Sequence, residues 1–138
     1  RKELSGVASA AIELQDGTII TSRSSSLLGP CAALLLNATK HLANISHETK
    51  LIPEALIEPI QKTKVDYLGG NNPRLHMDEV LVALSVLSLN DVNCRRALAM
   101  LPELNGLQAH ATVMLSQVDQ KIMKKLGILL TCDPAAKK

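Results

Sequence analysis

The last third of the chain changes its residue periodicity twice within a short stretch. Residues typical of a β-strand run from Ala109 to Leu115, helical spacing follows over Gln117 to Leu126, and a second β-rich run spans Ile128 to Thr131. Gly127 suits the end of the helix, because glycine readily adopts the left-handed backbone of a helix C-cap. A strand, a helix and a strand in so few residues predict a parallel strand pair joined by a right-handed crossover. The chain must therefore fold around a sheet that is at least partly parallel.

The first residues predict an antiparallel β-hairpin. Two β-rich runs, Val7 to Leu14 and Thr18 to Thr21, flank the residues Gln15-Asp16-Gly17. An Asp-Gly pair between such runs is a strong hairpin signal. Together with the parallel pair, this hairpin predicts a mixed sheet.

The middle of the chain predicts four helical stretches. Their bounds are Cys31 to Ala43, Pro53 to Tyr67, Pro73 or Met77 to Leu87, and Val92 to Leu101. Pro53 and Pro59 each suit a first helical turn, so the second stretch is expected to be a short turn followed by a helix. In the first stretch, Asn37 and Lys40 lie opposite the apolar stripe and are expected to face solvent. We therefore expect residues 1–138 to form a single α/β domain, a three-layer α/β/α sandwich with a mixed sheet that opens with a hairpin.

Composition excludes two classes of partner. Fifteen Lys and Arg against thirteen Asp and Glu leave a formal charge of +2, too small to predict binding to nucleic acid or anionic lipid. Tyr67 is the single aromatic residue among Phe, Trp and Tyr, so the chain lacks rings on which bases stack. The longest apolar stretches are shorter than the roughly 20 residues of a membrane span. We expect neither a nucleic-acid partner nor a membrane partner.

Cysteine usage and the first residues bear on localisation. Cys31, Cys94 and Cys132 are odd in number and far apart, which favours a reducing cytoplasm over a disulfide framework. Arg1 and Lys2 are not followed by an apolar segment, so no signal peptide is expected. A chain that begins without Met is expected to be a fragment or a processed product.

The opening hairpin and the helix that follows it resemble the start of the cytidine-deaminase fold. The hairpin residues are Ala10 to Ile20, and the helix begins at Cys31. Zinc deaminases need a His or Cys ligand two residues before a catalytic Glu, together with a Pro-Cys-x-x-Cys pair. With Cys31 at the first ligand, Ala33 stands in place of the Glu, and neither Cys94 nor Cys132 has a cysteine three residues away. We therefore expect a deaminase-like scaffold with no metal site and no cofactor.

A second resemblance covers nearly the whole chain. The segments that carry it are Ala33 to Ala38, Ile57 to Lys62, Asp66 to Gly69, Asn72 to His76, Ala109-His110 and Leu115 to Asp119. These segments, taken in this order along the chain, resemble the C-terminal portion of the bacterial family called domain of unknown function eighteen-forty-six. The resemblance implies a cytoplasmic protein of unassigned activity, whose preceding part includes a glycine-rich segment that looks phosphate-binding. Some members have been called ATP-dependent zinc proteases, but this chain has no His-Glu-x-x-His helix.

The most concentrated polar group lies at the start of the third helical stretch and contains Arg74, His76, Asp78 and Glu79. A loop at a helix N-terminus suits an anion, which Arg74 could hold through two contacts. Alternatively, Asp78 and Glu79 complement the helix dipole while Arg74 pairs with one of them. Capping is the preferred interpretation.

Two further residues are candidates for chemistry. His110 lies in a predicted strand, where a histidine can act as a base or a ligand or can simply be hydrogen-bonded. Ser116 follows that strand at its carboxyl end, where open α/β sheets place their ligands. Ser116 also fits the N-cap of the next helix, which is the preferred interpretation.

These observations support two hypotheses, and they do not decide whether the protein is an enzyme. The first is a noncatalytic module at the C-terminus of a longer protein, which docks on the rest of its own chain or associates with a second copy. The second is part of a site for a phosphate or carboxylate ligand. Its residues would be Arg74, His76, Glu79, His110 and Ser116.

Overall fold

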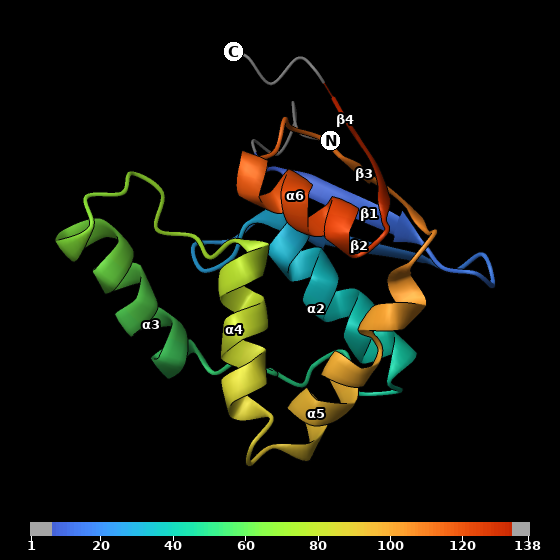
Figure 1. Cartoon of the computed structure of the whole chain (residues 1–138), viewed down its shortest axis with the longest axis horizontal. Helices are drawn as coiled ribbons and strands as arrows, with labels where there is room; N and C mark the ends of the chain where they lie inside the picture. Colours follow the sequence, from blue (N-terminus) through green and yellow to red (C-terminus); the bar gives the residue numbers. More distant parts are fainter. Residues whose placement is uncertain (1–6, 134–138) are drawn as a thin grey trace.

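A computed structural model describes residues 7–133, which fold around a four-stranded mixed sheet (Figure 1). The strands are β1 (Ser9–Glu13), β2 (Ile19–Arg23), β3 (Gln108–Ala111) and β4 (Leu129–Cys132), in the order β2-β1-β3-β4. β1 pairs antiparallel with both β2 and β3, whereas β3 and β4 are parallel. The predicted hairpin and the predicted parallel pair are both confirmed.

The helices fill the sequence between the hairpin and β3 and also connect β3 to β4. They are α2 (Pro30–Leu42), α3 (Glu54–Lys62), the π-helical turn η1 (Thr63–Tyr67), α4 (Met77–Leu87), α5 (Val92–Ala99), the 3₁₀ turn η2 (Leu101–Leu104) and α6 (Gln117–Lys125). The mixed α/β class is confirmed. The deaminase-like topology and the single-domain organisation stay predictions.

The sheet has one covered face and one open face. Ala10 and Ile12 of β1 and Ala109 and Ala111 of β3 are buried, because α2 packs on the hairpin and α6 packs on β4 (Figure 1). Side chains alternate along a strand, and the residues between these positions are exposed or half-buried. Within residues 7–133, both of these helices lie on the same face, and α4 packs against α2 and α6 rather than on the sheet. The helical layer expected on the second face is therefore not supplied by the described residues.

Helix α3 differs from the expected turn-then-helix because it starts at Glu54 and contains Pro59 in its interior. A proline inside a helix removes one backbone hydrogen bond. Pro59 is exposed, which leaves room for its ring. The chain then widens into the π-helical turn η1, and Ile57 is the buried residue of α3.

The polar face of α2 is less solvated than its spacing predicts. Lys40 is buried, and its Nζ donates hydrogen bonds to the carbonyls of His47 at 2.8 Å and Thr49 at 3.0 Å. Burial, together with nearby Lys50, lowers the pKa of Lys40. Lys40 therefore fixes the loop after α2 instead of facing water. Among residues 7–133, no helix has the length and apolar character to cross a membrane.

Candidate functional site

Three helices begin around one small crevice. Its volume is roughly 330 Å³, and it is bordered by Gly29 and Pro30 at the start of α2, His76 before α4, and Ser116 before α6. The crevice lies beyond the carboxyl end of β3, which is where open α/β sheets tend to bind ligands. Of the five predicted site residues, the structure brings Arg74, His76 and Ser116 to this crevice.

The start of α2 is the least capped of the three. Its N-cap is Gly29, which has no side chain, and no side-chain hydrogen bond caps this end. The first turn contains Cys31 and Ala32, both buried. The positive end of the α2 dipole is therefore directed towards the crevice. The two residues of this end that line the crevice offer it no backbone donor, because Pro30 has no N–H and the Gly29 N–H donates to the Leu75 carbonyl at 3.1 Å.

Ser116 caps α6, as the preferred interpretation of the sequence predicts. Its Oγ accepts a hydrogen bond from the Asp119 N–H at 3.2 Å. The hydroxyl oxygen is thus engaged in capping. In addition, the described hydrogen bonds of Ser116 include none to a histidine that could act as a base and make it a nucleophile.

Asp119 is a buried carboxyl group that the sequence reasoning missed. Only 3% of the residue is exposed, and its Oδ1 accepts the Met77 N–H at 2.9 Å, so a residue of α6 caps α4. Burial raises the pKa of Asp119, while the Met77 hydrogen bond and His76 act in the opposite direction. The spacing of Ser116 and Asp119 matches a capping-box pattern, and this pattern could have drawn attention to Asp119 in the sequence. In the structure, however, the Asp119 carboxylate caps the neighbouring helix α4 instead of its own helix.

Glu79 lies beside the crevice and belongs to a charged cluster at the start of α4. Its Oε1 accepts hydrogen bonds from the His76 N–H at 2.7 Å and from Lys64 Nζ at 2.9 Å. Lys64 Nζ also lies 3.4 Å from His76 Nδ1. The capping role predicted for Glu79 is confirmed, and the cluster holds the His76 ring at the edge of the crevice.

The capping interpretation expected Arg74 to pair with Asp78 or Glu79, and this expectation is wrong. Among the described residues, its Nε donates instead to the Ser25 carbonyl at 2.5 Å. The partner of Glu79 is Lys64, because η1 turns this lysine back towards α4. Arg74 therefore holds the loop before α2 and keeps further donors on its guanidinium group.

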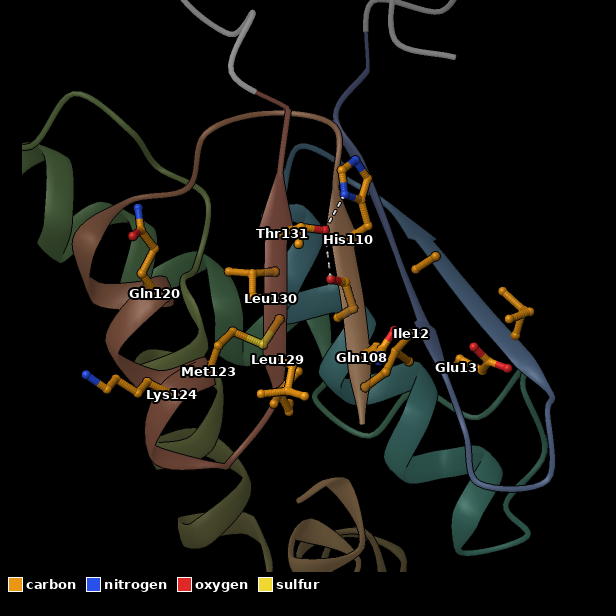
Figure 2. A pocket seen from close by; sticks show the side chains of 14 residues that line it. Ile12, Glu13, Gln108, His110, Gln120, Met123, Lys124, Leu129, Leu130 and Thr131 are labelled. Atoms are coloured by element: carbon orange, nitrogen blue, oxygen red, sulfur yellow. Dashed lines mark hydrogen bonds between the residues drawn. The ribbon is translucent and has the colours of Figure 1, made fainter. Parts of the chain in front are cut away.

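His110 lies apart from the other predicted site residues. Its ring lies on the open face of the sheet, where Nδ1 is 2.6 Å from Thr131 Oγ1 (Figure 2). Its Nε2 lies 2.9 Å from Asp133 Oδ1. The buried neighbours Ala109 and Ala111 point the other way. The hypothesis that Arg74, His76, Glu79 and His110 converge on one pocket is therefore wrong for His110.

Two of the described cysteines, Cys31 and Cys94, are buried free thiols. Burial, with Asp119 and Cys132 nearby, raises the pKa of the Cys31 thiol to about 12, so it stays protonated. Burial also raises the pKa of Cys94 to about 11. Residues 7–133 contain no group of three or more His, Cys, Asp or Glu side chains placed to hold a metal ion.

Comparison with known proteins identifies the family. The family described as domain of unknown function DUF1846, C-terminal, matches residues 1–138. The chain belongs to this family. Relatives named UPF0371 protein include one from Corynebacterium aurimucosum, 56% identical over 91% of this chain and 25% of its own length. Others come from Streptococcus thermophilus, 44% identical over 97% of the chain and 27% of its own, and from Corynebacterium diphtheriae, 47% identical over 99% and 28%. The chain thus spans about a quarter of the length of these relatives.

Proposed function

We propose that this DUF1846 C-terminal domain is a docking module, which packs through the open face of its sheet on the preceding part of a longer protein. The observation that carries this proposal is the contrast between the two faces. One face is buried under α2 and α6, whereas the other presents side chains from all four strands to solvent. Parallel strand pairs such as β3 and β4 usually lie in sheets that are covered on both faces.

The open face has the composition of an interdomain contact. Ile19 and Leu129 are 55% and 59% exposed at its two edges. Between them, in register, lie Glu13 and Gln108. Contacts between domains of one chain are more polar than obligate interfaces, and this row joins aliphatic ends to a polar centre.

The occupant we assign to this face is the rest of the same polypeptide. This chain covers about a quarter of the length of its relatives, so a much larger part of such a protein lies outside it. A second copy of the domain is the competing occupant. The setting we propose is cytoplasmic, which the free thiols of Cys31, Cys94 and Cys132 support.

A charge on the open face tests docking. In the longer protein that carries this domain, Leu129→Glu should weaken the contact by about 2–3 kcal/mol, because burial of the leucine is lost and a carboxylate is desolvated. Limited proteolysis between the domain and the preceding part should then become faster by tenfold or more. The matched control is Leu89→Glu, at a leucine that is 76% exposed away from the sheet. Equal proteolysis of the two variants and the unmodified protein would contradict docking through this face.

A second candidate function is binding of a phosphate or carboxylate group in the crevice. The observation that favours it is the convergence of Arg74, His76 and Ser116 on one pocket beside the uncapped start of α2. The Arg74 guanidinium group is a donor suited to an anion. Asp119 is occupied by its hydrogen bond with Met77.

Titration with inorganic phosphate tests this second function. Arg74→Gln should lower the affinity for phosphate about tenfold or more, since hydrogen bonds to charged groups contribute roughly 1.5–3 kcal/mol. The control is Lys62→Gln, which removes a positive charge from an exposed ion pair with Asp66. Chemical shifts of the His76 ring would report binding. Equal affinities of the two variants would rule out Arg74 as an anion ligand.

A further inference from the structure

The two edge strands of the sheet differ in how well their outer edges are covered. At the β2 edge, Asn37 Nδ2 of α2 donates to the Thr21 carbonyl at 3.0 Å. Arg23 adds a charge to the same strand, and charges on edge strands discourage further pairing. The β2 edge is therefore protected by residues of this domain.

The outer edge of β4 has no such cover within the described residues. The Leu129 N–H pairs with the Leu107 carbonyl at 2.8 Å, and the Asp133 N–H pairs with the Ala111 carbonyl at 3.0 Å. Because backbone groups alternate along a parallel ladder, the N–H and C=O groups of Leu130 and Cys132 point away from β3. The strand is Leu-Leu-Thr-Cys, without a charge, a proline or a bulge, so nothing in its sequence blocks the addition of a strand.

A hollow of roughly 760 Å³ extends from this edge across the open face as far as Glu13 and Ile19. It is bordered on the helical side by Gln120, Met123 and Lys124 of α6, and on the open side by Leu129 and Thr131 (Figure 2). Successive side chains of a strand point to opposite faces. A strand placed beside β4 would therefore have room for alternate side chains on both sides.

We propose that the outer edge of β4 receives a fifth strand from the preceding part of the longer protein. This inference rests on the proposed docking function and names the contact that fixes its register. The main chain of the added strand hydrogen-bonds to Leu130 and Cys132, and its side chains alternate between Gln120 on one face and Leu129 on the other. Lys124 beside the hollow selects a strand that carries an acidic or polar residue at that position.

Charge argues against a second copy as the occupant. A symmetric pairing of β4 with its own copy would place two α6 helices side by side on the same face. It would turn Lys124 of one copy towards Lys124 of the other, with Lys121 and Lys125 on the same helices. Like charges brought together in this way oppose association.

Hydrogen exchange in the longer protein, followed by NMR at single amides, tests the fifth strand. The amides of Leu129 and Thr131 point towards β3 and serve as the internal reference. We expect the amides of Leu130 and Cys132 to exchange about as slowly as this reference, at least a hundredfold slower than open amides. Fast exchange at Leu130 and Cys132 beside a protected Leu129 would overturn the proposal.

A pair of variants separates strand pairing from docking by the open face. Leu130→Pro removes an outward N–H without touching the ladder to β3, whereas Leu130→Ala keeps that N–H and shortens the same side chain. We expect Cys132 to lose its protection in the proline variant and to keep it in the alanine variant. If Leu129→Glu loosens the domain but neither variant at Leu130 changes exchange, docking stands and the fifth strand is wrong. Native mass spectrometry over a range of concentrations would detect a dimer. Protection of Cys132 that appears only in the dimer would show that a second copy, and not the preceding part of the chain, occupies the β4 edge.

Discussion

Replacement of Leu84 by alanine should lower the free energy of unfolding of this domain by about 2–5 kcal/mol, the range for truncation of a buried leucine. Leu84 lies on α4, the helix that packs on both α2 and α6, and is 0% exposed. Its removal leaves a cavity where α4 meets the layer that covers the sheet. Urea denaturation followed by circular dichroism would measure the change.

The control for this prediction is the same truncation at an exposed leucine. Leu89 follows α4 and is 76% exposed, so Leu89→Ala should change the free energy of unfolding by about 0.5 kcal/mol or less. Equal losses in the two variants would mean that α4 does not anchor the helices to one another.

The second large effect is expected at Asp119. Asp119→Ala should cost about 1–3 kcal/mol, because the buried Met77 N–H at the start of α4 loses its acceptor. Asp119→Asn keeps an oxygen acceptor at the same place, so most of this loss should be absent. Thermal and urea unfolding of the two variants at one pH would measure the difference. Equal losses would show that the hydrogen bond to Met77 contributes nothing.

The same carboxyl group predicts a pH dependence of known sign. Burial raises the pKa of Asp119 in the folded protein above its ordinary value of 3.8, so the folded state holds this proton more tightly than the unfolded state. Its stabilising contribution is complete below the unfolded pKa and is lost as the pH rises through the raised folded pKa. As the pH rises over this window, the unmodified protein should therefore lose stability relative to Asp119→Asn. A difference that is constant with pH would contradict the raised pKa.

Local patterns in the sequence account for much of the fold. The change in periodicity after Leu107 predicts β3, α6 and β4, and the Asp-Gly pair predicts the hairpin; all are present. The same alternation that buries Ala109 and Ala111 also places His110 on the other face. Convergence of His110 with Arg74 was therefore inconsistent with the strand predicted around it.

The remaining features depend on contacts between distant parts of the chain. The Asp119 carboxylate reaches a helix that begins 42 residues earlier, and no pattern within α6 indicates this. The position of Lys64 depends on the π-helical turn η1, which redirects a lysine that looks like a surface residue. Sequence spacing likewise gave no sign that α2 and α6 would lie on one face of the sheet.

The strand order has a consequence for how the domain is made. Its two central strands come from opposite ends of the chain: Ser9, the first residue of β1, bonds to Thr112, the residue after β3, across 103 residues of sequence. During synthesis, α2 to α5 leave the ribosome before β3 exists, so their apolar sides have only a hairpin to cover them. The entropy lost in closing such a long loop comes before the contacts that compensate it, so the sheet is completed only after the last strands have emerged.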